Sequence, residues 1–182
     1  MRLLFASIIL ATLSSPLLAQ HSHHGSHSPS PSPAGSPYAE FRTRTIKTLS
    51  AQQIDDLRAG RGMGLALAAE LNSYPGPMHV LEHEQALGLT AGQKTSLNAL
   101  MVSMRADAIK AGQAMIESES ALDRLFADGK ANNDALNSAV FRAAQAAGEV
   151  RLVHLRTHIL VKKDLTPEQI TTYNRLRGYV GP

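Results

Sequence analysis

Two pairs of histidines stand four residues apart in the part of this 182-residue chain that we expect to fold, His79 with His83 and His154 with His158. Residues four apart lie one above the other on a helix, at the spacing where two imidazoles can share one metal ion. A single pair of histidines at this spacing on one helix is more often incidental than a pair of metal ligands. Two pairs on two helices, however, can together supply four ligands. We therefore take His154 and His158 as a candidate metal site, with His79 and His83 as their partners.

A third histidine group lies near the N-terminus, within the Ser/Pro-rich residues 20–37. This stretch offers almost no apolar surface to bury, so we expect it to be a disordered tail. Its imidazoles could collect Zn, Ni or Cu with low selectivity, or they could merely keep a polar spacer soluble. Composition is the only signal here, and both interpretations stay open. The histidines of this tail are His21, His23, His24 and His27.

The pair His154 and His158 continues an apolar helical stripe. Intervals of four and three residues are typical of one helix face, and the pattern predicts a long helix from Asp134. Both imidazoles therefore fall on a face, or at the margin of a face, that is otherwise apolar. The residues that set the rhythm are Leu136, Val140, Ala143, Ala147 and Val150.

Three related pentapeptides mark where helices begin. They are Leu49-Ser50-Ala51-Gln52-Gln53, Leu89-Thr90-Ala91-Gly92-Gln93 and Leu165-Thr166-Pro167-Glu168-Gln169. In each, the hydroxyl can cap the helix and the glutamine three positions later can reach back to the cap backbone. Pro167 fits a first helical position, where no amide donor is needed.

The second pentapeptide, at residues 89–93, predicts the start of a helix that runs to about Ala127. The turn Asp128-Gly129-Lys130 then connects it to the helix from Asp134. A short connection indicates antiparallel neighbours, so these two helices form a hairpin. His154 and His158 then lie near the level of residues 95–108, where the first and last helices also gather. The inward positions of the first long helix are Leu97, Leu100, Met101, Met104, Ala108, Ala111, Met115, Leu122, Leu125 and Phe126.

The methionines of that helix are interpreted as core filler rather than as soft metal ligands, because they fall on the packing seam. A short helix over Met78–Leu87, closed by Gly88, carries His79 and His83. At the open end of the hairpin this helix can bring them to His154 and His158.

An alternation of glycines at Gly60, Gly62 and Gly64 follows the first helix. The spacing of these glycines resembles that of a phosphate-binding loop, but no strand precedes them and no Gly-Lys-Ser/Thr follows them, so we reject that interpretation. A bend, or the close approach of another helix backbone, explains these glycines better.

Composition sets the class of the chain. Arg2, an apolar run over Leu3–Leu13 and small residues up to Ala19 predict a signal peptide over residues 1–19, so we expect an exported protein with no membrane span after processing. Cysteine and tryptophan are absent, and few aromatic residues accompany plentiful Ala, Leu and Met. We expect one all-α domain over residues 38–182 with a thin interior, which favours pairing as a homodimer. Nucleic acid is not an expected partner.

With its two Leu-Thr-x-x-Gln boxes, at residues 89–93 and 165–169, the chain resembles the Spy/CpxP family of periplasmic proteins, which includes heavy-metal resistance and sensor proteins of the ZraP and CnrX type. The resemblance covers residues 78–177. It implies an all-helical, cradle-like fold, usually dimeric, that acts in envelope stress. Such proteins serve as ATP-independent chaperones or bind Zn, Ni or Co through histidines. The glycine segment and the helix before Leu89 depart from the smaller chaperones.

Two functions follow from these observations. The first is transition-metal binding (Zn, Ni, Co or Cu) at the histidine pairs, in heavy-metal resistance or sensing. The second is a holdase chaperone for unfolded envelope proteins, with a membrane-bound stress sensor as another possible partner. We expect no enzyme, because neither His-x-x-x-His has the glutamate that a metalloprotease uses as its base. The basic residues that could contact clients, or form an ordinary solvated face, are Arg105, Lys110, Arg142, Arg151 and Arg156.

Overall fold

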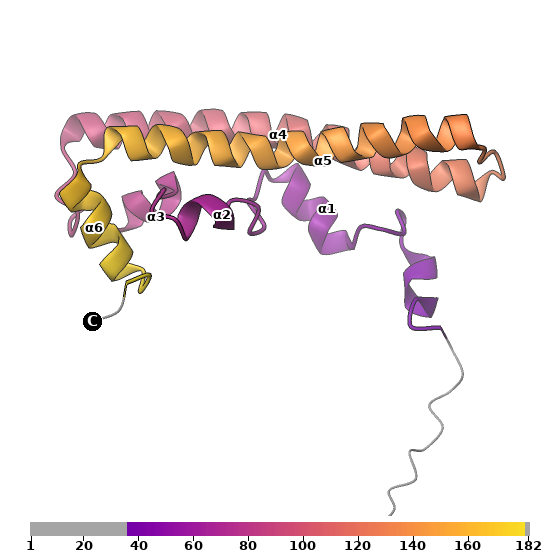
Figure 1. Cartoon of the computed structure of the whole chain (residues 1–182), viewed down its shortest axis with the longest axis horizontal. Helices are drawn as coiled ribbons and strands as arrows, with labels where there is room; N and C mark the ends of the chain where they lie inside the picture. Colours follow the sequence, from indigo (N-terminus) through magenta and orange to yellow (C-terminus); the bar gives the residue numbers. More distant parts are fainter. Residues whose placement is uncertain (1–35, 181–182) are drawn as a thin grey trace, which may run out of the picture. The chain divides into compact units, whose positions relative to one another are not determined.

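The computed structural model describes residues 36–180, and every regular element among them is a helix. The expected all-α class is therefore confirmed for this part of the chain, and none of its helices is long and apolar enough to cross a membrane. The predicted signal peptide and the tail histidines lie outside the described residues. The α-helices in Figure 1 are α1 (Ala51–Arg58), α2 (Leu67–Glu70), α3 (Pro77–Glu82), α4 (Ala91–Ala127), α5 (Asn133–Asp164) and α6 (Pro167–Leu176), and a 3-10 helix, η1, spans Ala39–Thr43.

All three predicted helix starts are confirmed as capping boxes. The hydroxyls of Ser50, Thr90 and Thr166 each accept a hydrogen bond from the backbone of the glutamine three residues later, whose side chain bonds the cap backbone in return. These bonds satisfy amide groups that a helix start otherwise leaves unpaired.

The glutamines of the second and third boxes also bind each other. Gln93 Nε2 lies 2.8 Å from Gln169 Oε1, and Gln169 Nε2 lies 3.1 Å from Gln93 Oε1. Gln93 Nε2 also donates to the carbonyl of Asp164, at 2.8 Å. The start of α4 is thereby joined to the end of α5 and the start of α6.

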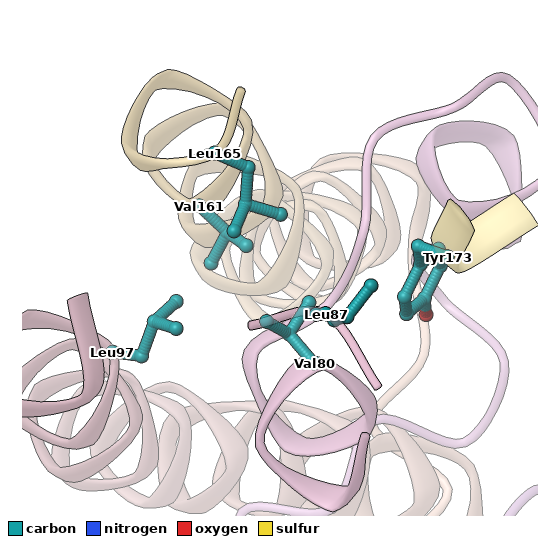
Figure 2. Close-up of a cluster of buried hydrophobic side chains, with 6 residues drawn as sticks. All are labelled: Val80, Leu87, Leu97, Val161, Leu165 and Tyr173. Carbon is teal, nitrogen blue, oxygen red and sulfur yellow. The ribbon is translucent and has the colours of Figure 1, made fainter. Parts of the chain in front are cut away.

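The two longest helices, α4 and α5, pack against each other and lie side by side in Figure 1. Two clusters of buried apolar side chains form the core. The first joins α3, α4, α5 and α6 (Figure 2), and the second joins α1 and the residues before it to α4 and α5. The first contains Val80, Leu87, Leu97, Val161, Leu165 and Tyr173, and the second contains Ile46, Leu49, Leu57, Ile116 and Val150.

The predicted helix over Met78–Leu87 is too long. Helix α3 ends at Glu82, and the next residue, His83, has left helical geometry with φ −105° and ψ 21°. His79 and His83 are therefore not stacked on one helix face, because the helix ends between them.

Two residues expected to face inward are exposed instead. Phe126 is 58% and Val140 is 45% exposed, whereas Ala139 and Ala143 are buried. Around Val140, α5 buries the small side chains of alanines, so the helical period alone assigned the larger Val140 to the wrong face.

Candidate metal-binding site

His154 and His158 are both buried on α5, at 4% and 8% exposure. They occupy the interval between Val150, which belongs to one core cluster, and Val161, which belongs to the other. The apolar stripe of α5 is thus interrupted by two imidazoles where the two clusters separate. The prediction that both histidines lie on the inward face is confirmed.

The Nε2 atom of His154 is buried and has no hydrogen-bond partner among the described residues. Burial lowers the pKa of His154 below its usual range, and the neighbouring His158 lowers it further. The imidazole of His154 is therefore held in its neutral form, which is the form that donates a lone pair to a metal ion.

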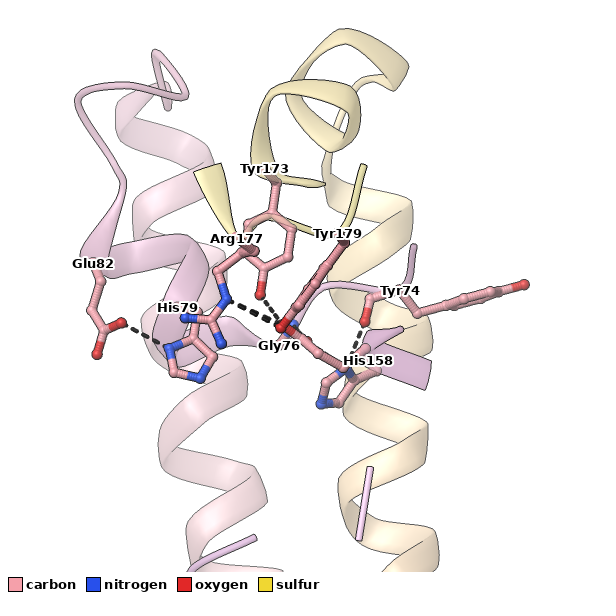
Figure 3. Close-up of polar contacts among 9 residues, drawn as sticks. Tyr74, Gly76, His79, Glu82, His158, Tyr173, Arg177 and Tyr179 are labelled. Atoms are coloured by element: carbon pink, nitrogen blue, oxygen red, sulfur yellow. Dashed lines mark hydrogen bonds and ion pairs between the residues drawn. The ribbon is translucent and has the colours of Figure 1, made fainter. Parts of the chain in front are cut away.

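His158 is oriented by a backbone carbonyl. Its Nδ1 lies 2.7 Å from the carbonyl oxygen of Tyr74 (Figure 3), and since a carbonyl only accepts, Nδ1 carries the hydrogen. In the neutral ring the lone pair is then on Nε2. An imidazole N–H bonded to a carbonyl is the arrangement that commonly orients a metal-ligating histidine.

His79 is oriented in a similar way by Glu82. His79 Nδ1 lies 2.8 Å from Glu82 Oε2, and the hydrogen bond from His79 lowers the pKa of that carboxyl. His79 lines the same cavity as His154 and His158, whereas His83 does not. The structure therefore brings three of the four predicted histidines to one cavity and leaves His83 outside it.

This cavity, which we call the histidine–methionine cavity, has a volume of about 590 Å³. Its wall comes from the segment after α1, from α2 and α3, from the first half of α4 and from the second half of α5. Among the described residues, no group of three or more His, Asp or Glu side chains lies close enough together to hold a metal ion. The side chains with donor atoms that line it are His79, His154, His158, Met63, Met78, Met101, Met104 and Glu70, and the cations that line it are Arg61 and Arg105.

Two glycines leave space in front of the buried imidazoles. A Cβ atom at Gly62 would lie 3.6 Å from His154 Nδ1, and one at Gly76 would lie 3.1 Å from His158 Nε2. Any larger residue at either position would place its side chain against the ring. The absence of a side chain at both positions lets the two rings lie close to the backbone of this segment.

Another of the sequence-predicted glycines allows a close backbone approach. Gly60 has φ +67°, and a Cβ there would lie 2.9 Å from the carbonyl oxygen of Arg105 on α4. The interpretation of the glycine alternation as a bend against another helix backbone is confirmed at this residue.

The analysis of the sequence missed a buried carboxylate, Glu70, which is 7% exposed. It accepts hydrogen bonds from the hydroxyl of Tyr173, from the hydroxyl of Tyr179 at 3.0 Å and from the amide of Gly76 at 3.1 Å. Arg177 Nε lies 3.7 Å from Glu70 Oε1. Burial and the bond to Glu70 raise the pKa of Tyr173. Glu70 thus ties the segment that carries Gly76 to α6, and no period in the short α2 segment could have indicated this.

All five basic residues proposed for client contact are exposed, and only Arg105 lines the histidine–methionine cavity. The other four are Lys110, Arg142, Arg151 and Arg156.

Comparisons with protein-family models, with curated proteins and with solved structures found no match to this chain.

Proposed function

We propose that this chain is a metal-binding protein of the Spy/CpxP type, in which His154 and His158 bind a transition-metal ion within the histidine–methionine cavity. The observation that carries the proposal is the buried Nε2 of His154, which has no hydrogen-bond partner in the part of the chain that the structure describes, on a ring that lines one cavity with two further imidazoles. A buried polar atom normally has a partner, so an unpartnered imidazole nitrogen at this position suits a bound metal ion, which accepts the lone pair of the unprotonated nitrogen.

The wider biological role follows from the sequence. The predicted signal peptide would place the protein in the periplasm, where it would serve heavy-metal resistance or sensing. There α4 and α5 would form the antiparallel hairpin of a cradle, with a second copy as the dimer partner. The two Leu-Thr-x-x-Gln boxes, whose glutamines Gln93 and Gln169 bind each other, support this resemblance.

The test is calorimetric titration of Zn, Ni, Co and Cu(II) into the chain with the four tail histidines replaced by alanine. We expect binding that is lost in the same chain carrying His154→Ala and His158→Ala. The variant His83→Ala, whose histidine lies outside the cavity, is the matched control and should bind as the parent does. If the double variant binds the metals as tightly as the parent and keeps its helix content by circular dichroism, the proposal is contradicted.

A second candidate is a holdase chaperone. Large apolar side chains are exposed on α4 and α5, among them Val102 at 71% and Phe141 at 74%. Exposed apolar surface beside cations offers weak, adaptable contacts to unfolded chains. Suppression of the aggregation of a reduced client protein, measured without metal, would support this function. A complete lack of suppression at every molar ratio would exclude it.

A further inference from the structure

The methionines of this chain are concentrated at the histidine–methionine cavity. Four of the six line it, namely Met63, Met78, Met101 and Met104. Of the other two, Met115 packs against the second core cluster and Met1 lies outside the described residues. These four come from three separate parts of the chain: the segment after α1, helix α3 and the first half of α4.

Two of these methionines do not serve as core filler. Met63 is 38% and Met78 is 52% exposed, and neither residue belongs to a core cluster. Met63 also has φ +46°, a conformation that residues other than glycine rarely adopt. Unfavourable backbone conformations of this kind persist where the surrounding structure imposes them, and they cluster at functional sites.

The chemistry of these donors selects one kind of metal. Thioether sulfur is a soft ligand, and soft ligands favour Cu(I) among the transition metals. The chain contains no cysteine, so methionine is its source of soft sulfur. Imidazole is also a ligand for copper, and the neutral ring of His154, which lines the same cavity, has an Nε2 atom without a hydrogen-bond partner among the described residues.

The charges around the cavity favour a monovalent ion over a divalent one. Arg61 and Arg105 line it, and Arg61 pairs with Asp56 just as Glu70, the carboxylate that lines it, pairs with Arg177. Arg105 is the lining cation that has no ion pair among the described residues. Thioethers and neutral imidazoles add no negative charge. Since Coulomb repulsion from Arg105 is proportional to the charge of the bound ion, Arg105 repels a divalent ion twice as strongly as a monovalent one.

We infer that the cavity is a site for a soft monovalent metal ion, Cu(I) or its analogue Ag(I), bound by His154 together with thioethers from Met63, Met78, Met101 and Met104. The inference rests on the proposed function, because it names the metal class of the same site. It assigns to these methionines a ligand role that packing alone would not require.

The first experiment follows each methionine separately. The full chain with His21, His23, His24 and His27 replaced by alanine is labelled with ¹³C at the methionine methyl groups and titrated with Ag(I) in chloride-free buffer. We expect the methyl signals of the four cavity methionines to shift with one equivalent of Ag(I), while the signal of Met115 stays in place. A titration that shifts none of the four overturns the inference.

The second experiment measures Cu(I) affinity by competition with a chromophoric Cu(I) chelator under anaerobic conditions. One variant carries Met63→Leu, Met78→Leu, Met101→Leu and Met104→Leu, changes that conserve volume and apolar character. We expect it to bind Cu(I) more than about 100-fold more weakly, since even the loss of an outer partner typically costs about 10–100-fold. The matched control is Met115→Leu on the same helix, which should bind as the parent does.

The outcomes separate this inference from the proposed function. Zn or Ni binding that depends on His154, with no response to Ag(I) or Cu(I), overturns the inference and leaves the proposed function standing. No binding of any of these ions overturns both. Cu(I) binding as tight in the quadruple methionine variant as in the parent, with matching thermal unfolding, also overturns the inference.

Discussion

His154 is a buried ionisable residue whose burial and whose neighbour His158 both act against its protonation. Its environment is apolar on the side of the core, and the charged or titratable groups that line the same cavity are His79, His158, Arg61, Arg105 and Glu70. Burial lowers the pKa of His154, and the interaction with His158 lowers it further. The stability of the metal-free protein should therefore depend on pH through this residue.

The sign of that dependence follows from proton binding. An unfolded chain gives His154 a pKa near 6.5, above the lowered value in the folded state. Between these two values the unfolded state binds more protons, so the free energy of unfolding falls as the pH falls. The stabilisation is complete above about pH 6.5 and is lost as the pH drops through the folded pKa.

We predict that the chelator-treated protein loses stability between pH 7.5 and pH 5.5, and that His154→Gln loses less over the same interval. Urea unfolding at several pH values measures both. Parallel pH profiles for the two proteins would show that another group is responsible.

Glu70 gives a second prediction at the residue scale. Glu70→Ala leaves the hydroxyl of Tyr173 and the amide of Gly76 buried without their acceptor, and each buried unpaired group costs about 1–3 kcal/mol. We expect a loss of stability on the order of 3 kcal/mol in denaturant unfolding, whereas the exposed Glu149→Ala should change it by less than about 0.5 kcal/mol. Similar values for the two variants would contradict a structural role for Glu70.

At the scale of elements, the contact of α1 with α4 depends on a glycine. A Cβ atom at Gly112 would lie 2.5 Å from the carbonyl oxygen of Leu57, and backbone atoms cannot retreat as a flexible side chain can. By contrast, a Cβ at Gly148, within α5, would meet nothing within 4 Å. The same substitution should therefore have opposite effects at the two glycines.

We predict that Gly112→Ala destabilises the protein by about 1–3 kcal/mol, as overpacking of a tight contact does. Gly148→Ala should instead stabilise it by about 0.5–1 kcal/mol, because alanine is the better helix former. Thermal unfolding of both variants measures the difference. Stabilisation by both would mean that α1 does not approach α4 as closely as the structure shows.

At the scale of the whole molecule, the proposed site joins segments that are far apart in the sequence. The histidine–methionine cavity takes its wall from the glycine segment, α2, α3, α4 and α5, so a bound ion would tie several elements together. A ligand that binds only the folded state stabilises it by mass action.

We predict that a soft metal ion at 100 times its dissociation constant raises the free energy of unfolding by about 2.7 kcal/mol. Thermal unfolding with and without Ag(I), in the tail-histidine variant described above, measures this. The variant His83→Ala should keep the shift, and the pair His154→Ala and His158→Ala should abolish it. A shift of the same size in that double variant would place the stabilising ion elsewhere.

The sequence by itself determined the features that depend on local hydrogen bonds and on helical period. Ser50, Thr90 and Thr166 begin helices because each cap bonds its own chain three residues later. The stripe of α5 placed His154 and His158 on a buried face for the same local reason, since a helix repeats every 3.6 residues. The all-helical class followed from these patterns and from composition.

Only the tertiary structure decided which side chains share the cavity. His79 lines it and His83 does not because α3 ends at Glu82, and the spacing of four residues has no geometric meaning beyond a helix end. The gathering of four methionines and the burial of Glu70 arise where the irregular segment between α1 and α4 folds over both long helices. That segment has no sustained period, so its neighbours are set by long-range packing, which sequence spacing does not encode.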